Sequence, residues 1–260
     1  MELGLRGKRA LITGGSHGIG LAAAKVLAGE GCDVAICSRN RDRLAPSAEA
    51  LRSFGHAVIA EPCDVHSAED ISGFCDTVVR AWGGVDILVN NVGGGGRWGQ
   101  PSIEDTEEKV WLEVYEKNAL AAVRFTVRFL PYMRQKKWGR VVTVTSRLGR
   151  EGGGRPWFNM AKAAQSSMMK TLGMNHDLAG DGITFNSVAP GNIMIPNTGW
   201  DEDKKRDPEG FRKYVAQECP LGRLGTPEEV GAVIAFICSQ QASLINGAAI
   251  AVDGGESRAF

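Results

Sequence analysis

The stretch TGGSHGIG, residues 13–20, follows the apolar run Arg9–Ile12 and precedes a helical pattern that extends from Leu21 to Glu30. A glycine-rich turn between a strand and a helix lets a pyrophosphate approach the backbone, where the helix amino end offers unpaired N–H groups and partial positive charge. An ordinary glycine-rich connection is the alternative, but both flanking elements stand where a phosphate-binding turn requires them. The stretch therefore predicts a nucleotide-binding turn.

The composition is that of a soluble globular protein. With 260 residues, 43% apolar and 23% charged, the chain fits one domain with a sizeable core. Lys plus Arg and Asp plus Glu are equal at 30 each, so we expect neither nucleic acid nor a membrane as a partner. The amino terminus has no signal-peptide apolar region, and the six scattered cysteines include no CxxC pair. We therefore expect a cytoplasmic protein with reduced thiols and no metal site.

Short apolar runs alternate with longer helical patterns along the whole chain. The apolar runs are continuous rather than alternating, which is typical of parallel strands buried on both faces. This order predicts an α/β fold, a single-domain Rossmann-type doubly wound parallel sheet of about seven strands with helices on both faces. The expected strands are Arg9–Thr13, Asp33–Ser38, Ala57–Pro62, Val85–Asn90, Gly139–Thr145, Ile183–Ala189 and Ala248–Val252.

One long segment, residues 191–220, is expected to be irregular and contains a charged run at residues 201–207. A loop of this length inside a compact domain is usually a lid or a binding loop. It follows the carboxyl end of a strand, the edge at which open α/β sheets bind ligands. We therefore expect an irregular substrate lid within a single dinucleotide-binding and catalytic domain, with the charged run on a solvated helical face.

The end of the second expected strand indicates which dinucleotide is bound. A fold that prefers NAD places an acidic residue there to hold the ribose 2′-hydroxyl, whereas this chain has Ser38 and Arg39, with Arg41 and Arg43 nearby. A guanidinium can bind a 2′-phosphate through two hydrogen bonds. The sequence favours NADP(H) over NAD(H), with Arg39 as the main contact and His17 as an additional one.

Further motifs follow the opening turn in a fixed order. They are NNVG at 90–93, Asn118 in a long helical pattern, Ser146 after a strand, Lys162, Pro190 with Gly191, and a closing pattern over residues 222–255. With the TGxxxGxG form of the turn, they resemble the short-chain dehydrogenase/reductase family over nearly the whole chain. The resemblance implies hydride transfer between C4 of a nicotinamide and a carbonyl/alcohol pair. It also implies a homotetramer or homodimer, with interfaces on the last strand and on the helices that bear Asn118 and Lys162.

The same resemblance assigns roles to individual residues. Ser146 would hold the substrate oxygen, Lys162 the nicotinamide ribose, and Asn118 a water in a proton relay. Asp64 would bind the adenine amino group, a role compatible with capping the helix that begins near Ser67. The residues expected to contact the cofactor are Gly14, Ser16, His17, Gly18, Ile19, Gly20, Arg39, Asp64, Val65, Asn91, Gly93, Lys162, Pro190, Gly191 and Ile193.

One residue departs from the family pattern. The family has Tyr-x-x-x-Lys, whose four-residue step puts both side chains on one helix face, but this chain has Phe158 before Lys162. A tyrosine phenol can give or take the proton of the reacting oxygen, and losing such a group costs about 10²–10⁴ in rate. Phe158 keeps the shape of the ring without the proton, so catalysis is expected to be impaired or mechanistically altered.

The sequence leaves three explanations of Phe158 open. It can be an engineered change, or a native residue with another proton source, or a sign that the protein binds a nucleotide without turnover. Some relatives without this tyrosine reduce conjugated C=C bonds of acyl-CoA thioesters. The expected function is NADP(H)-dependent reduction or oxidation of a carbonyl/alcohol pair, with C=C reduction and non-catalytic NADP(H) binding as alternatives.

Overall fold

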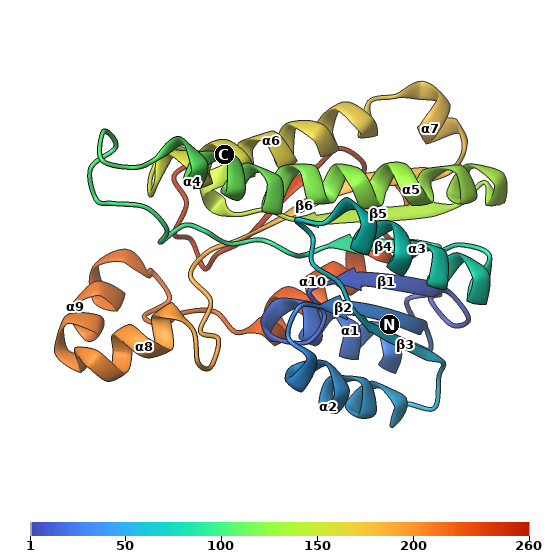
Figure 1. Ribbon diagram of the computed structural model, residues 1–260, viewed down its shortest axis with the longest axis horizontal. Coiled ribbons are helices and arrows are strands. Elements are labelled where there is room, and N and C mark those ends of the chain that lie inside the picture. Colours follow the sequence, from blue (N-terminus) through green and yellow to red (C-terminus); the bar gives the residue numbers. More distant parts are fainter. Residues whose placement is uncertain (1, 260) are drawn as a thin grey trace.

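The computed structural model describes residues 2–259. Its centre is one seven-stranded sheet in the order β3-β2-β1-β4-β5-β6-β7 (Figure 1), and every neighbouring pair is parallel. The strands are β1 Arg9–Thr13, β2 Asp33–Ser38, β3 Val58–Pro62, β4 Ile87–Asn90, β5 Gly139–Val144, β6 Ile183–Pro190 and β7 Ala249–Val252. The predicted Rossmann-type fold is confirmed, with strand ends shifted by one or two residues.

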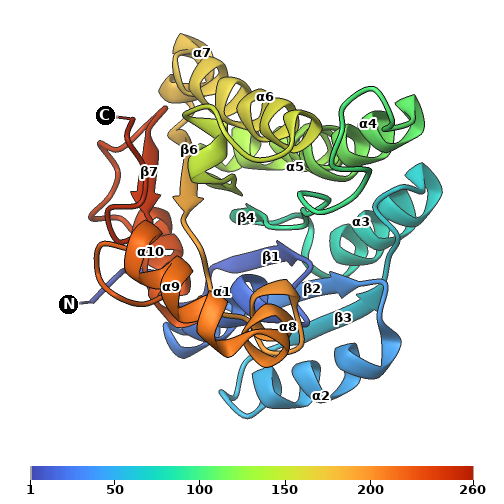
Figure 2. The same cartoon turned by 90° about the vertical axis from the view of Figure 1, so that its left-hand side faces the viewer.

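Helices cover both faces of this sheet, as the view along the sheet in Figure 2 shows. The helices of one face are α1 Gly18–Gly29, α2 Arg41–Arg52 and α10 Pro227–Cys238. Those of the other face are α3 Ala68–Trp82, α4 Glu108–Tyr115, α5 Ala121–Lys136, α6 Pro156–Gly173 and the short α7 His176–Gly180. Because the strand order reverses between β1 and β4, the two connections diverge there and open a crevice at the carboxyl edge.

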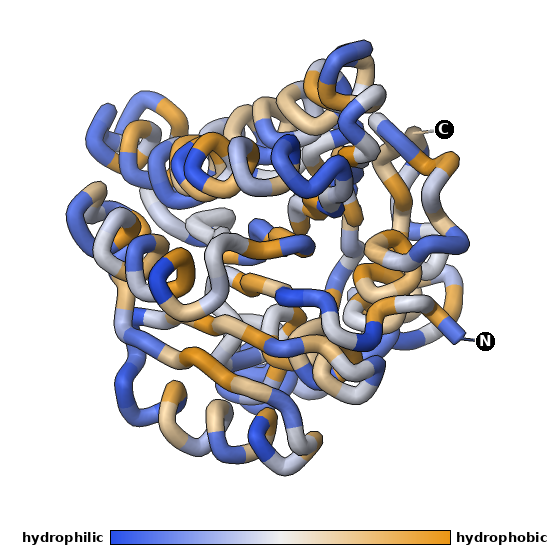
Figure 3. Tube along the Cα trace, turned by 90° about the vertical axis from the view of Figure 1, so that its right-hand side faces the viewer, coloured by the Kyte–Doolittle hydropathy of each residue, from blue (hydrophilic) through white to orange (hydrophobic). Residues whose placement is uncertain are grey.

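The apolar residues of the strands form two cores, one on each face. One core joins β1 and β2 to α1 and α10, and the other joins β4 and β5 to α3 and α5. Every residue of β5 and β6 is buried, and the apolar colours of Figure 3 are concentrated along the central strands. Burial on both faces explains why these strands are continuous apolar runs instead of alternating ones.

The long helical pattern before Ser146 is not one regular helix. Between α4 and α5 the backbone forms a five-residue π-helical turn, η1 Glu116–Leu120, which contains Asn118. Such turns are rare and occur often at functional sites. The sequence predicted the helix and the position of Asn118, and the family resemblance implied that Asn118 interrupts the backbone hydrogen bonding of the helix. The π-helical form of this interruption is a finding of the structure.

The segment 191–220 is less irregular than the sequence predicted: the charged run, expected on a solvated helical face, lies almost entirely in a helix, and a second helix follows it. It contains two helices, α8 Gly199–Arg206 and α9 Pro208–Glu218, which protrude together at one end of the molecule in Figure 1. Neither helix has a buried residue. The sequence of α8, GWDEDKKR, has no apolar stripe, whereas α9 carries a short one at Phe211, Tyr214 and Val215 that the sequence analysis did not use. Across residues 2–259, no helix combines the length and the apolar character needed to cross a membrane.

Candidate active site

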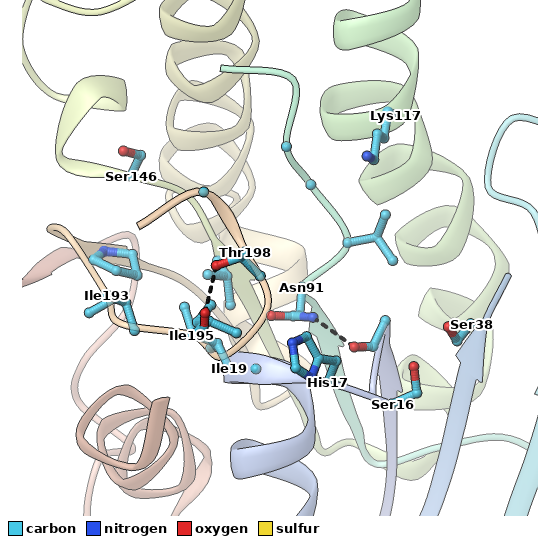
Figure 4. A pocket seen from close by; sticks show the side chains of 18 of the residues that line it. Ser16, His17, Ile19, Ser38, Asn91, Lys117, Ser146, Ile193, Ile195 and Thr198 are labelled. Carbon is cyan, nitrogen blue, oxygen red and sulfur yellow. Dashed lines mark hydrogen bonds between the residues drawn. The ribbon is translucent and has the colours of Figure 1, made fainter. Parts of the chain in front are cut away.

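A cleft of about 700 Å³ opens at the carboxyl edge of the sheet. It joins the glycine turn after β1 to the ends of β4, β5 and β6 and to the first turn of α8. Figure 4 shows Ser38 and Ser146 at opposite ends of the cleft, with His17, Asn91 and Lys117 between them. Of the predicted site residues, the cleft is lined by Gly14, Ser16, His17, Gly18, Ile19, Arg39, Val65, Asn91, Gly93, Ser146, Phe158, Lys162, Pro190, Gly191 and Ile193.

The glycine turn presents the amino end of α1 to the cleft. Gly14 and Gly18 have positive φ values of 67° and 54°, which side chains other than glycine adopt only with strain. His17 precedes the helix without capping it; its Nε2 instead donates a hydrogen bond to the Pro196 carbonyl oxygen at 2.9 Å. The first-turn N–H groups of α1 therefore have no side-chain cap, which suits an anionic ligand.

Gly20 was predicted to contact the cofactor, but it does not line the cleft. A Cβ atom there would overlap Asn91 Nδ2 and lie 2.5 Å from the Gly14 carbonyl oxygen. Asn91 Nδ2 donates to the Thr13 carbonyl oxygen at 2.8 Å and so ties β1 to the segment after β4. Gly20 is therefore required for the close packing of α1 against Asn91 and the Gly14 backbone, on the side of the turn that faces away from the cleft.

The far end of the cleft is cationic. Ser38, Arg39 and Arg43 line it, and Arg39 is half exposed, with Nη1 3.8 Å from Asp64 Oδ2. Asp64 itself is not among the lining residues, and its Oδ1 accepts a hydrogen bond from the His66 N–H. The cap of α3 is Ser67, not Asp64. Asp64 therefore lies beside the cleft, next to the guanidinium that was predicted to bind the 2′-phosphate.

Ser146, Phe158 and Lys162 meet at the opposite end of the cleft. Ser146 follows β5, and its hydroxyl oxygen accepts a hydrogen bond from the Leu148 N–H at 3.2 Å; the hydroxyl proton can still be donated to a ligand. Phe158 and Lys162 lie one turn apart on α6, with Lys162 Nζ 5.7 Å from the centroid of the Phe158 ring. Among residues 2–259, no tyrosine lines this cleft, so no other phenol takes the place of the one missing at position 158.

Lys162 is buried, and its surroundings change its titration. Nζ donates to the Val144 carbonyl oxygen and to Gln165 Oε1, both at 3.0 Å. Burial, together with the positive charge of Lys117, lowers the pKa of Lys162 to about 7. This ammonium therefore changes its charge near neutral pH, which is the range of an acid–base group.

Asn118 is fully buried in η1 and does not line the cleft. Its side chain binds the backbone of Gly94 in both directions, with Oδ1 accepting from the N–H at 3.1 Å and Nδ2 donating to the carbonyl oxygen at 2.9 Å. Its own carbonyl oxygen accepts a hydrogen bond from Gln165 Nε2 at 2.9 Å. Asn118 thus fixes the glycine segment after β4, residues 93–96, and connects, through Gln165, to Lys162.

Arg97 and Lys117 line the cleft but were not predicted to belong to the site, and Arg43, noted only as a neighbour of Arg39, lines it as well. Lys117 Nζ lies 4.6 Å from the Trp98 ring centroid, and burial, with the charge of Arg39, lowers its pKa. Arg97 forms an ion pair with Asp203 of α8 at 2.7 Å and lies over the Trp200 ring. The ion pair joins the residue that follows the glycine segment to α8, whose first turn also lines the cleft.

Replacing Gly93 by Ala is expected to lower the free energy of unfolding by about 1–3 kcal/mol, the usual cost of forcing an extra methyl into a packed site, and to weaken NADPH binding because it displaces Lys162. The added Cβ would lie 2.7 Å from Asn118 Oδ1 and 2.8 Å from Lys162 Nζ, so both groups would have to move. Nicotinamide fluorescence measures the affinity and thermal unfolding measures stability. Gly73→Ala on α3 is the matched control, because its Cβ would meet nothing within 4 Å; equal affinities for the two variants would contradict the expectation.

Comparisons with known proteins agree with this arrangement. A family model described as enoyl-(acyl carrier protein) reductase matches residues 14–257. The chain is 33% identical over 254 residues to rabbit (Oryctolagus cuniculus) dehydrogenase/reductase SDR family member 4, covering 96% of this chain and 94% of the relative. It is 34% identical over 255 residues to a 3-oxoacyl-(acyl-carrier-protein) reductase of Thermotoga maritima, covering 96% and 98%.

A solved structure of a reductase has the same fold. The L-sorbose reductase of Gluconobacter frateurii, complexed with NADPH and L-sorbose, superposes with a TM-score of 0.92 at 32% identity over 100% of both chains. The family match, the full-length relatives and the shared fold all point the same way. The chain belongs to the short-chain dehydrogenase/reductase family of oxidoreductases.

Proposed function

We propose that this protein binds NADP(H) and transfers a hydride between the nicotinamide and a carbonyl/alcohol pair, with a proton-transfer step altered by Phe158. The observation that carries the proposal is the single cleft that joins the uncapped amino end of α1 to Ser146 and Lys162. A dinucleotide needs a phosphate site at one end and a polar pocket for the reacting group at the other. This cleft has both.

The charges of the cleft fit NADP(H). Its charged lining residues are Arg39, Arg43, Arg97, Lys117 and Lys162, and among the described residues no carboxylate joins them. A polyanionic dinucleotide with a 2′-phosphate matches such a surface, whereas a carboxylate near Ser38 would repel it. The L-sorbose reductase neighbour, whose structure contains NADPH, is a further argument for this choice.

The residues of the chain divide the remaining work. The α1 amino end and the glycine turn hold the pyrophosphate, Arg39 with Arg43 the 2′-phosphate, and Lys162 the nicotinamide ribose. Pro190, Gly191 and Ile193 form the floor under the nicotinamide, and Ser146 donates a hydrogen bond to the substrate oxygen. The bound cofactor supplies or accepts the hydride. Helices α8 and α9 form a lid over the substrate end, where the Arg97–Asp203 ion pair holds α8 in place.

A second candidate function is reduction of a C=C bond conjugated to a thioester carbonyl. Phe158 favours it, because the proton then goes to carbon and needs no phenol beside the carbonyl oxygen. The enoyl reductase description of the matching family model is in line with this chemistry, whereas the ketoacyl and sorbose reductases among the relatives support a carbonyl substrate. A third candidate is NADP(H) binding without turnover.

The proposal also includes self-association of the chain. Helices α4, α5 and α6 expose Leu112, Val127 and Met160, and 64% of Val127 is accessible. Apolar side chains on neighbouring helices are typical of an interface between subunits, which supports a homodimer or homotetramer.

The six cysteines are buried as free thiols, in agreement with a cytoplasmic location.

The function is tested by NADPH binding and by NADPH oxidation over one panel of ketones, sugars and enoyl thioesters. We expect NADPH to bind more tightly than NADH, and slow oxidation with at least one ketone or sugar. Oxidation with enoyl thioesters alone would establish the second function instead. NADPH binding without any substrate-dependent oxidation, even when Phe158 is replaced by Tyr, would leave only the binding protein.

A further inference from the structure

Gln165 links two groups of the site that are far apart in the sequence. It lies on α6 one turn after Lys162 and is only 1% exposed. Its Oε1 accepts a hydrogen bond from Lys162 Nζ at 3.0 Å, and its Nε2 donates to the Asn118 carbonyl oxygen at 2.9 Å. Both ends of the amide are therefore used, and α6 is connected to η1 beneath the cleft.

These contacts determine which way the Lys162 amine can act. Nζ has three positions around it, and two of them carry hydrogens that point at the Val144 carbonyl oxygen and at Gln165 Oε1. Nζ also lies against Gly93, which lines the cleft with it. The third position of Nζ is free to contact a ligand. It carries a hydrogen that can be donated when the lysine is charged, and a lone pair that can accept a hydrogen bond when the lysine is neutral.

In the structure, a side chain connects Lys162 to the Asn118 carbonyl oxygen. The family resemblance predicted a water held by Asn118 as part of a proton relay. Here a primary amide joins Lys162 to the Asn118 carbonyl oxygen, and an amide side chain neither gains nor loses a proton near neutral pH. The amide can orient the lysine and stabilise its charge, but it does not carry protons away.

We propose that Gln165 is a positioning residue for Lys162. The hydrogen bond from Lys162 Nζ to the Gln165 amide oxygen orients the amine toward the cleft and stabilises its charged form. This inference rests on the proposed NADP(H) binding, in which Lys162 holds the nicotinamide ribose. Gln165 acts only through Lys162 and touches no ligand itself, because it does not line the cleft.

The charges around Lys162 define what a change at Gln165 does. Lys117 on η1 is the titratable group whose charge acts on it, in the direction that lowers its pKa. The other neighbours of the amine, Val144 from β5, Gly93 after β4 and Phe158 on α6, carry no charge. The Gln165 oxygen is a neutral acceptor, so a carboxylate in its place adds the first negative charge next to the ammonium.

The experiment measures the NADPH dissociation constant against pH, by nicotinamide fluorescence, in the protein and in variants of Gln165. An anionic ligand binds more tightly when Lys162 is charged, so affinity is expected to fall as the pH rises through about 7. Gln165→Glu should move this midpoint upward by about one unit or more, the usual effect of an adjacent opposite charge. Gln165→Leu removes the acceptor oxygen at similar volume and should move the midpoint downward.

Two controls isolate the effect. Subtracting the profile of Lys162→Met removes the titration of the cofactor phosphates and of the other cleft groups. Gln135→Glu adds the same charge at an exposed position on α5 and should leave the midpoint unchanged. Opposite shifts in the two Gln165 variants support the proposal.

A purely structural Gln165 would weaken binding equally at every pH, and unmoved midpoints would overturn the proposal. Because either variant can lose its fold, each is checked by thermal unfolding; where only one variant folds, a midpoint shift in its expected direction supports the proposal and an unmoved midpoint overturns it. If the unsubstituted protein does not bind NADPH at all, the proposed function itself is wrong. That result is distinct from binding with an unmoved midpoint.

Discussion

Replacing Phe158 by Tyr is expected to raise NADPH-dependent reduction of a carbonyl substrate by about 10²–10⁴-fold, the usual contribution of a positioned general acid. Phe158 lines the cleft with Ser146, so the phenol would be added at the substrate end. Lys162 Nζ is 5.7 Å from the ring centroid, and a nearby ammonium lowers the pKa of a phenol from its usual value of about 10. The rate of NADPH oxidation at saturating cofactor measures the gain.

The matched control for this gain is Phe158→Leu, which removes the ring but adds no proton donor. It should bind NADPH and remain as slow as the original protein, because neither side chain carries an acidic proton. A Tyr variant no faster than the Leu variant on every ketone and sugar would show that the missing phenol is not the defect. If the original protein is already fast on enoyl thioesters and tyrosine slows it, Phe158 belongs to the native mechanism of C=C reduction.

Much of the fold was predictable because its signals are local. The strands are buried on both faces, so each is a continuous apolar run, and the turn after β1 has glycines where φ is positive. The substitution at position 158 was also visible, because the step from 158 to 162 is fixed by one turn of α6. These local signals predict the order of the strands and helices and the edge of the sheet at which a ligand binds.

Contacts across the chain were not predictable in the same way. Gln165 reads as an ordinary residue of a helix, and only the packing of α6 against η1 brings it to the Asn118 carbonyl oxygen. Arg97 and Lys117 reach the cleft because the glycine segment and η1 meet there, and neither has a sequence signal of its own. The family resemblance assigned Asp64 to the cofactor, but no local signal indicated its ion pair with Arg39.

Replacing Arg39 by Ala is expected to weaken NADPH binding by about 10–100-fold while changing NADH binding little, because a hydrogen-bonded charge pair contributes about 1.5–3 kcal/mol. Arg39 lies at the end of β2 among Ser38 and Arg43, and its only ion pair is an exposed one with Asp64 at 3.8 Å within the described chain. Exposed pairs of this kind contribute little to stability, so the variant should stay folded. Titration with NADPH and with NADH, followed by nicotinamide fluorescence, gives both dissociation constants.

Arg41→Ala separates a specific contact from a general loss of positive charge. Arg41 begins α2 two residues after Arg39 but does not line the cleft, so its removal changes the charge without removing a ligand contact. The ratio of the NADPH to the NADH dissociation constant should therefore rise in Arg39→Ala and stay constant in Arg41→Ala. Equal losses in the two variants would mean that the 2′-phosphate is recognised only by the overall field of the cleft. A loss of NADH binding as large as that of NADPH would place Arg39 near a part that both cofactors share, and would remove the main argument for NADP(H).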